Sequence, residues 1–388
     1  MILTISNLFP RPDEPQRGLF NLQLFERLHR QDAVHNICLV PSCKMWSWPA
    51  IRAWDSPQAA AFRTSYTPVF YIPLLGRTWS WITYLLSLRA AGIELDAVDV
   101  LYAAWLYPDG VVATRLAGDK PVWLMVQGSD IFHLKNPIRR RLIRDACERA
   151  AGVICVSSNL ADQLAENGID PERIHVVHNG VDGDRFRYRD RTDARAALRS
   201  SASLGGMADL GDQPLALFVG HLVPVKGPDI LLQSWAQVRI DSPEAHLVFV
   251  GEGVERPSLE AALRDRGIGD RVHFVGAQDQ DSVAVLMAAA DVLCLPSRSE
   301  GMPNAMLEAL ATGLPVVATD VGCCREILEP VDGCAIVPRE DATALADAMR
   351  TALEAVPDRR ALADSQRGRF SWDRQAQGIL ELMNGATR

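Results

Sequence analysis

Two carboxylates lie around a helix start in the second half of the chain. Residues 296–320 read PSRSEGMPNAMLEALATGLPVVATD, with Glu300 in a Gly/Pro-rich turn and Glu308 inside the apolar helix expected after it. Eight residues at helical rise span about 12 Å, an upper figure because Glu300 precedes the helix. The paired carboxylates of a glycosidase lie roughly 5 to 9.5 Å apart, so hydrolysis by such a pair is not indicated. The spacing fits the two ends of a nucleotide sugar, with the hexose at Glu300 and the ribose hydroxyls at Glu308.

A lysine stands at a second strand-to-helix loop. The segment HLVPVKGPD (221–229) follows an apolar strand, presents Lys226 and turns at Gly227 into a helix. A lysine there can meet a phosphate as a point charge, beside the free N–H groups of the helix N-terminus. A merely solvent-exposed lysine would be mildly unfavourable at that end of the helix dipole, which favours the anion site. Pro303 suits a first helical turn, so the N–H groups of residues 301–304 are expected to form a second anion cradle.

The pattern of apolar runs predicts the elements that position these residues in a parallel α/β fold. In the first half, strands are predicted at 2–6, 34–40, 98–101, 121–126, 152–156 and 174–177, and helices at 19–28, 137–150 and 157–166. Residues 46–90, rich in Trp, Tyr and Pro, do not resolve into elements.

The second half repeats the alternation more regularly. Strands are predicted at 215–220, 245–251, 271–276, 291–296, 315–319 and 334–338, with helices at 229–238, 281–290 and 371–383. Residues 183–214 are charged, then rich in small residues, which predicts a domain connection and a surface loop. Strands alternating with helices predict a doubly wound sheet in each half, with ligands at the carboxyl ends of the strands.

Composition limits the class of protein. A chain of 388 residues favours two domains, and 48% hydrophobic with 23% charged residues is typical of a globular protein. No run reaches the roughly 18 apolar residues of a membrane span, and no signal peptide or metal-like cysteine spacing is evident, which favours a reduced, cytoplasmic protein. The net charge of −8 and the lack of a binding module argue against nucleic acid. The basic run 135–144 is either a solvated helix face or a patch for anionic lipid or a phosphorylated acceptor.

Four segments together resemble a known family. SRSEGMPNAMLEALATGLPVVATDVG resembles the Glu-x7-Glu signature of family-four retaining glycosyltransferases with the GT-B architecture. GHLVPVKGPDILL resembles that family's phosphate-binding loop, HNGVD (178–182) its segment before the domain linker, and FSW (370–372) the start of its closing helix. The similarity spans nearly the whole chain and extends to bacterial polysaccharide and teichuronic-acid-type enzymes.

The resemblance implies an architecture and a reaction. Residues 1–183 would form an acceptor-binding Rossmann-like domain, and residues 184–369 a nucleotide-sugar-binding one that faces it across a cleft. A helix at about 370–388 would pack back on the first domain. A sugar would pass from a nucleotide donor with retention of anomeric configuration, and neither a metal nor any other cofactor would be required.

The resemblance also assigns residues. It gives catalytic roles to Lys226, Glu300 and Asp130, and donor binding to Gly18, His221, Gly301, Met302, Pro303, Asn304 and Glu308. Glu300 would bind donor-sugar hydroxyls, with backbone amides of residues 301–304 beside it. Glu308 would bind the ribose and Lys226 the departing diphosphate, while Gly18 would let the main chain approach the donor phosphates. No residue set indicates a covalent intermediate; positive groups aimed at the leaving group would lower the barrier.

Two positions depart from the family pattern. His221 stands where many relatives carry Arg, so the loop has less charge unless the imidazole is protonated. Gln127 stands where many relatives carry His. Asp130 in the same loop either orients the acceptor or caps a helix, and His133 is interpreted as a bystander.

Two short motifs are weaker signals. DQD (279–281) matches an Asp-x-Asp metal motif, but Asp281 or Ser282 is better explained as a helix cap. GEG (251–253) lacks the third glycine of a dinucleotide fingerprint.

The predicted function is therefore a retaining hexosyltransferase of surface polysaccharide or glycolipid synthesis. Its acceptor would be a lipid-linked saccharide or oligosaccharide, met by peripheral contact with the inner membrane face. The alternatives are a nucleotide-sugar epimerase of the same architecture and a catalytically degenerate relative that only binds the donor.

Overall fold

The computed structural model describes residues 1–55, 60–71, 78–200, 211–355 and 357–386. These form two compact units. Unit 1 comprises Met1–Asn179 with Trp372–Arg388, and unit 2 comprises Gly180–Ser371. The divisions follow residues 179 and 371, where the sequence placed them after residues 183 and 369.

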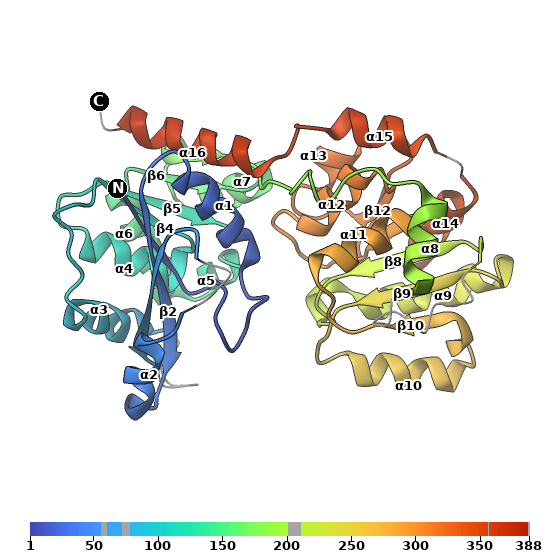
Figure 1. The fold of residues 1–388 in the computed structure, drawn as a ribbon, viewed down its shortest axis with the longest axis horizontal. Coiled ribbons are helices and arrows are strands. Elements are labelled where there is room, and N and C mark those ends of the chain that lie inside the picture. The colour runs from blue at the N-terminus through green and yellow to red at the C-terminus, as the bar shows by residue number, and fades with distance from the viewer. Residues whose placement is uncertain (56–59, 72–77, 201–210, 356, 387–388) are drawn as a thin grey trace. The chain divides into compact units, whose positions relative to one another are not determined.

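Unit 1 is built on a parallel sheet with the order β3-β2-β1-β4-β5-β6-β7 (Figure 1). Its described strands are β1 (Ile2–Ser6), β2 (Val34–Ser42), β3 (Arg63–Phe70), β4 (Val100–Ala103), β5 (Val122–Val126), β6 (Gly152–Cys155) and β7 (Ile174–Val176). Its helices are α1 (Leu19–His29), α2 (Trp48–Arg52), α3 (Ser80–Ala90), α4 (Val111–Leu116), α5 (Ile131–Leu134), α6 (Pro137–Arg149), α7 (Ser158–Glu166) and α16 (Trp372–Ala386). Short turns of helix occur at η1 (Met45–Ser47), η3 (Leu106–Gly110) and η4 (Pro171–Arg173).

Strand β3 lies in the segment that the sequence pattern left unassigned. It pairs in parallel with β2 from Arg63 to Phe70, and Pro68 falls within it. A proline cannot donate to a strand ladder, so within a sheet it is confined largely to edge strands. Because β3 is at the end of the strand order, the fold tolerates Pro68 there.

Helix α16 belongs to unit 1 although it is the last element of the chain, and it packs against α1. The buried Gln375 on α16 donates through Nε2 to Oδ1 of Asn179 at 3.0 Å. Arg30, after α1, lies 3.7 Å from Asp373. These contacts give the C-terminal segment a defined place on unit 1.

Unit 2 contains a second parallel sheet, with the order β10-β9-β8-β11-β12-β13 (Figure 1). Its described strands are β8 (Leu215–Val219), β9 (His246–Val250), β10 (Val272–Phe274), β11 (Val292–Leu295), β12 (Val316–Thr319) and β13 (Ala335–Val337). Its helices are α8 (Arg191–Ser200), α9 (Pro228–Asp241), α10 (Arg256–Arg266), α11 (Gln280–Ala289), α12 (Asn304–Thr312), α13 (Cys324–Leu328), α14 (Ala342–Glu354) and α15 (Arg359–Gln366), with short turns at η6 (Pro224–Lys226) and η7 (Gly269–Arg271). Phe218, Trp235 and Phe249 lie in one buried core cluster of this unit.

Both sheets are parallel with helical crossovers, which confirms the prediction of two doubly wound, Rossmann-like domains. Among the described helices, none combines the length and the apolar content that crossing a bilayer would require.

Helix α8 corrects the prediction that residues 183–214 are only connection and loop. Asp190 starts the helix, since its Oδ1 accepts from the N–H groups of Thr192 at 2.8 Å and Asp193 at 3.3 Å. The buried Ala194 and Leu198 face inward together with Arg195, whose side chain is 1% exposed. The helix is amphipathic, but Leu198 is its only large apolar residue, which is why composition alone indicated a loop.

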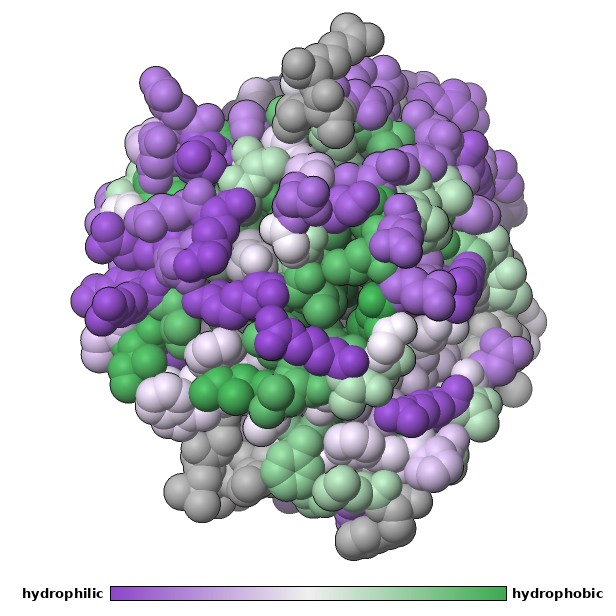
Figure 2. All heavy atoms as spheres, turned by 90° about the vertical axis from the view of Figure 1, so that its left-hand side faces the viewer, coloured by the Kyte–Doolittle hydropathy of each residue, from purple (hydrophilic) through white to green (hydrophobic). Residues whose placement is uncertain are grey.

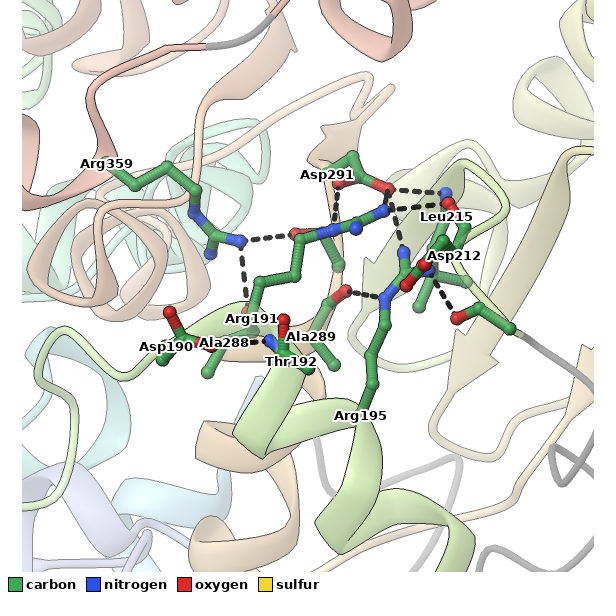
Figure 3. A network of polar contacts seen from close by, with 12 residues as sticks. Asp190, Arg191, Thr192, Arg195, Asp212, Leu215, Ala288, Ala289, Asp291 and Arg359 are labelled. Carbon is green, nitrogen blue, oxygen red and sulfur yellow. Dashed lines mark hydrogen bonds and ion pairs between the residues drawn. The ribbon is translucent and has the colours of Figure 1, made fainter.

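The arginines of α8 meet one carboxylate at the amino-terminal edge of the sheet in unit 2 (Figure 3). Asp291 lies 2.7 Å from Nε of Arg191 and 3.0 Å from Nη2 of Arg195, and it accepts from the N–H of Leu215 at 2.9 Å. Arg359, at the start of α15, donates to the carbonyl oxygens of Met287, Ala288, Ala290 and Gly313 at 2.8–3.1 Å. The network therefore fixes α8 and α15 against α11 and the sheet.

Candidate functional site

Lys226 and Glu300 form an ion pair in unit 2. The ammonium nitrogen of Lys226 lies 2.7 Å from each carboxylate oxygen of Glu300. The Oγ of Ser297 donates to Oε1 of the same carboxylate at 2.7 Å. The side chain of Glu300 is 8% exposed, whereas that of Lys226 is 29% exposed. The pair thus offers a partly accessible ammonium held on a nearly buried acid.

The loop after β8 holds Lys226 in place. Lys226 ends the short turn η6, and Gly227 then takes a left-handed conformation with φ 64° before α9 begins at Pro228. A Cβ on Gly227 would lie 2.1 Å from the carbonyl oxygen of Pro296. Only glycine therefore permits both the φ angle and the close approach to the turn that carries Glu300.

The turn after β11 presents Glu300 and the start of α12. Gly301, Met302 and Pro303 are buried, and Asn304, the first residue of α12, is half-buried. Thr319 Oγ1 donates to the carbonyl oxygen of Ser297 at 2.5 Å, so β12 supports this turn.

The predicted amide cradle is corrected at one position. Pro303 occupies the N-cap of α12, one residue before the helix, and it has no N–H to donate. Of the four residues assigned to this role, only Gly301, Met302 and Asn304 can supply backbone N–H groups.

Glu308 lies on α12 and is half-buried. Burial raises the pKa of its carboxyl from 4.5 to about 7, and the charge of Arg185 opposes that rise. Within the part of the chain that the structure describes, this carboxyl makes no hydrogen bond. It is a candidate acceptor for ligand hydroxyls.

Arg185 is a neighbour of the candidate site that the sequence reasoning did not name. It donates to Oδ1 of Asp281 at 2.8 Å and to Oε1 of Gln280 at 2.5 Å, and it lies 3.4 Å from Asp182. Its charge acts on Glu308. Arg185 stands in a run, DGDRFRYRDRT, in which arginines and acids recur, so no single position is distinguished by sequence.

His221 is exposed at the start of the loop after β8. The main chain next to it is supported by the GEG segment, since the N–H of Leu222 donates to the carbonyl of Glu252 at 3.0 Å. The N–H of Glu255 in turn donates to the carbonyl of Leu222 at 3.0 Å. These bonds give the GEG segment a structural role beside the Lys226 loop.

The DQD motif caps α11, but through a different residue from the two expected. Asp279 is the N-cap, and its Oδ1 accepts from the N–H of Ser282 at 2.7 Å. Asp281 pairs instead with Arg185. Within the described ranges, no group of three or more His, Cys, Asp or Glu side chains is arranged to hold a metal ion.

In unit 1, Gly18 is the N-cap of α1 and has φ 61°. A Cβ there would lie 2.4 Å from the carbonyl oxygen of Leu8, so the chain needs glycine at this point. Asn21 Nδ2 also donates to the Leu8 carbonyl at 2.7 Å, and Arg17 Nε donates to that of Asn7 at 3.2 Å. Gly18 is thus part of a close-packed loop after β1.

Asp130 is fully buried and holds main-chain groups from two segments. Its Oδ1 accepts from the N–H of Leu106 at 2.8 Å, and its Oδ2 from those of Gln127 at 2.8 Å and Gly128 at 3.3 Å. It makes no side-chain cap to α5, which excludes the helix-cap alternative. Burial raises its pKa to about 6, against the lowering effect of these N–H groups.

Gln127 and His133 lie on either side of Asp130 in sequence. Gln127 Oε1 accepts from Asn179 Nδ2 at 3.4 Å, which connects the loop after β5 to the end of unit 1. His133 Nδ1 lies 3.0 Å from Nη1 of Arg139, so this histidine has a defined basic neighbour that the sequence did not indicate.

Two segments of the chain match models of known protein families. Residues 20–185 match the model described as Glycosyltransferase Family 4, and residues 213–355 match the model described as Glycosyl transferases group 1. Both models describe glycosyltransferases, and together they span most of the chain. The matched segments include the loop of Asp130 in unit 1 and the loops of Lys226 and Glu300 in unit 2, whereas Gly18 lies just before the first of them.

Two curated relatives share one name. The D-inositol 3-phosphate glycosyltransferase of Nocardioides sp. is 32% identical over 271 residues, which are 65% of this chain and 57% of that one. The protein of the same name from Xylanimonas cellulosilytica is 36% identical over 231 residues, which are 57% and 53% of the two chains. The alignments thus span a little over half the length of these relatives. Both are named transferases, which does not favour the epimerase alternative.

Solved structures share the fold over the whole chain. Anabaena HepE in complex with UDP-glucose has a TM-score of 0.75 at 19% identity, with 99% of both chains covered. The sucrose-phosphate synthase of Thermosynechococcus elongatus has a TM-score of 0.77 at 22% identity, covering 100% of this chain and 98% of that one. WaaG, a glycosyltransferase of lipopolysaccharide biosynthesis, has a TM-score of 0.69 at 20% identity. These neighbours establish the GT-B fold class.

Proposed function

We propose that the protein transfers a sugar from a nucleotide-sugar donor with retention of configuration and without a metal cofactor. The observation that supports this most is the Lys226–Glu300 pair at the carboxyl edge of a parallel sheet, with Glu308 on the adjoining helix. A nucleoside diphosphate would lie at Lys226, the hexose at Glu300 and the ribose at Glu308. HepE, a structural neighbour, has been solved with UDP-glucose, which supports this class of donor.

The chemistry is electrostatic. As the bond between sugar and diphosphate breaks, negative charge grows on the phosphate oxygens, and the Lys226 ammonium would stabilise it. Because Lys226 contacts both oxygens of Glu300, it can give up one contact to a phosphate and keep the other. Glu300 would then have one oxygen available to accept from a sugar hydroxyl. The acceptor hydroxyl would attack from the face that the diphosphate leaves.

Asp130 acts in this proposal by shaping a loop. Asp130 is fully buried and both of its oxygens accept from main-chain N–H groups, so its carboxylate has no exposed surface on which to contact a sugar. We assign it the positioning of Gln127 and Gly128 at the carboxyl end of β5. Gly18 would serve the donor phosphates from the loop after β1.

A phosphate on the acceptor is supported by a cluster in unit 1, made of Thr78, Tyr107, His133 and Arg139. The guanidinium of Arg139 contacts His133 at 3.0 Å and Thr78 Oγ1 at 3.5 Å and lies 5.8 Å from the ring centroid of Tyr107. Among the described residues, no carboxylate pairs with Arg139. A half-buried guanidinium with neutral or basic neighbours is suited to an anionic group.

Two classes of acceptor carry a phosphate. One is D-inositol 3-phosphate, for which the relatives are named, and the other is the lipid-linked saccharide that the sequence predicted. The lipid alternative is supported by exposed apolar side chains directly before α3 and on α3, α5 and α6. These are Trp79, Ile82, Leu86, Phe132 and Ile138. Figure 2 shows hydrophobic surface among strongly hydrophilic residues on the side of the molecule that faces the viewer. Such a surface suits peripheral contact with an anionic membrane.

The first experiment is a thermal-shift panel of nucleoside diphosphates and their sugars, which stabilise the protein if they bind the native state. A nucleotide sugar that binds is then incubated with D-inositol 3-phosphate, with inositol and with a lipid-linked saccharide phosphate. Transfer to a phosphorylated acceptor, with a raised KM in Arg139→Ala, supports the proposal. Binding without transfer to any acceptor would favour the degenerate relative, and interconversion of the donor without acceptor would favour the epimerase.

A further inference from the structure

Arg298 lies two residues before Glu300 and uses every N–H of its guanidinium. Nε donates to Glu340 Oε1 at 2.5 Å, and Nη2 donates to Glu340 Oε2 at 3.1 Å and Asp229 Oδ2 at 2.8 Å. Nη1 donates to Asp229 Oδ1 at 2.8 Å and to the carbonyl oxygen of Pro224 at 2.5 Å. Both carboxylates are held in fork geometry, which a lysine cannot reproduce.

These partners belong to three loops at one edge of the sheet in unit 2. Pro224 and Asp229 follow β8, Arg298 follows β11 and Glu340 follows β13. The main chain adds one bond, from the N–H of Arg298 to the carbonyl of Val225 at 2.8 Å. One side chain therefore joins the loop of Lys226, the turn of Glu300 and the loop before α14.

Glu340 supports a positioning role independently. It is a non-glycine residue with φ 60°, a conformation that costs an L-residue roughly 1 kcal/mol or more and persists when its surroundings hold it. Its carboxylate is held by Arg298 through both oxygens.

Lys226 lies between the two anchored points of its loop. Pro224 is two residues before it and Asp229 three residues after it, and Arg298 binds both. Glu300 is linked to the same arginine through the main chain of one intervening residue, Ser299. The distance from the Lys226 ammonium to the Glu300 carboxylate is thus set from both sides by Arg298.

We infer that Arg298 is a positioning residue that holds Lys226 against Glu300 for the leaving group of the transfer reaction. The inference rests on the proposed function for its kinetic consequence, but its structural consequence can be measured without turnover. Arg298 itself would touch neither the sugar nor the diphosphate.

The structural test uses the scarcity of lysine in this chain. Only Lys44, Lys120, Lys135 and Lys226 are present, so amine acylation read by mass spectrometry reports on Lys226 with three internal references. The acylation rate of Lys226 relative to Lys44 should rise at least threefold in Arg298→Gln, and also in Glu300→Gln, which removes the partner directly. Arg325→Gln is the matched control, because Arg325 also bridges two carboxylates in unit 2, Asp320 and Glu329. An unchanged rate in Arg298→Gln with a raised rate in Glu300→Gln would overturn the inference.

The kinetic test is a double-mutant cycle. Arg298→Gln should lower kcat at least tenfold, and it should lower the rate by less than twofold when added to Lys226→Ala. Arg298→Lys keeps the charge and serves as a milder variant if Arg298→Gln fails to fold. Independent, multiplying effects would show that Arg298 does not act through Lys226. If the wild-type protein neither binds a nucleoside diphosphate nor transfers a sugar, the proposed function fails, while the acylation result still decides the role of Arg298.

Discussion

The ammonium of Lys226 lies at the same distance, 2.7 Å, from both carboxylate oxygens of Glu300. The two residues are 74 positions apart in sequence and follow different strands of one sheet. Sequence reasoning assigned them to different parts of a ligand, one to the sugar and one to the diphosphate. The ion pair places both assignments at a single point, where sugar and leaving group would separate.

Removing either member of the pair should slow the reaction strongly. Glu300→Ala and Lys226→Ala are each expected to lower kcat at least tenfold, since a preorganised charge at the leaving group is typically worth about 10²–10³ in rate. Steady-state kinetics with the donor found by thermal shift would measure this. Lys44→Ala, which removes an exposed lysine of unit 1, should keep the wild-type rate. Full activity in both site variants would show that the site is wrongly assigned.

Gly227→Ala should damage the site, whereas Gly267→Ala should not. Both glycines have φ near 63°, so each substitution carries a left-handed penalty of about 1–2 kcal/mol. Only at Gly227 would the new Cβ also collide, 2.1 Å from the carbonyl of Pro296, because nothing lies within 4 Å of a Cβ at Gly267. Chemical denaturation gives the free energy of unfolding of each variant, and kinetics give its kcat. The difference between the two variants then reports the clash at Gly227, because the backbone strain is common to both. Equal losses of stability and of kcat would contradict the collision at Gly227.

The stability of the protein should depend on pH through Glu308. Its pKa is raised from 4.5 to about 7 by burial, so between these values the folded chain keeps a proton that the unfolded chain releases. This group's contribution to stability is therefore present at low pH and is lost as the pH rises through about 7. Glu308→Gln cannot ionise, and its Tm relative to wild type should increase from pH 5 to pH 8. Melting curves at several pH values test this, and a constant difference in Tm would count against the raised pKa.

Asp291→Asn should destabilise unit 2. The substitution leaves Arg195, which is almost fully buried, and Arg191 without their carboxylate, and breaking such a buried pair costs about 3–5 kcal/mol. Arg325→Ala removes more exposed ion pairs and should cost much less. Denaturant titrations would give both free energies of unfolding. A cost at Asp291 no larger than that at Arg325 would mean that the network in Figure 3 adds little to stability.

Much of the fold could be predicted because hydrophobic periodicity is strong in buried parallel strands. Runs such as Leu215–Val219 and Val122–Val126 are apolar throughout, and they match β8 and β5. The exceptions include β3, where Pro68 marks an edge strand, and α8, where Arg195 occupies a buried position. A proline in a strand and an arginine on the buried face of a helix both interrupt the hydrophobic periodicity. The fold accepts them because of their tertiary surroundings, which the local sequence does not show.

The site could be predicted only in part. Lys226 and Glu300 could be proposed because each lies in a loop that follows a strand, where ligands of parallel sheets bind, and Glu308 because it lies on the helix after Glu300. Arg185 and Arg298 were missed because their partners, such as Asp281 and Glu340, lie far away in sequence. One signal was available: a chain with four lysines and 36 arginines has a single lysine in unit 2, at position 226. In a chain that otherwise prefers arginine, a lysine at position 226 indicates a role that needs a compact point charge.

The discontinuous make-up of unit 1 has a consequence for biosynthesis. Its last helix, α16, leaves the ribosome only after the whole of unit 2 has been translated. At about 5–20 residues per second, the nascent N-terminal sheet waits on the order of 10–40 s for the segment that covers α1. Unit 2, continuous from Gly180 to Ser371, has no such delay. A nonsense mutation just before α16 would therefore leave unit 1 incomplete and exposed to proteases and chaperones. Unit 2, although it is translated later, would be complete.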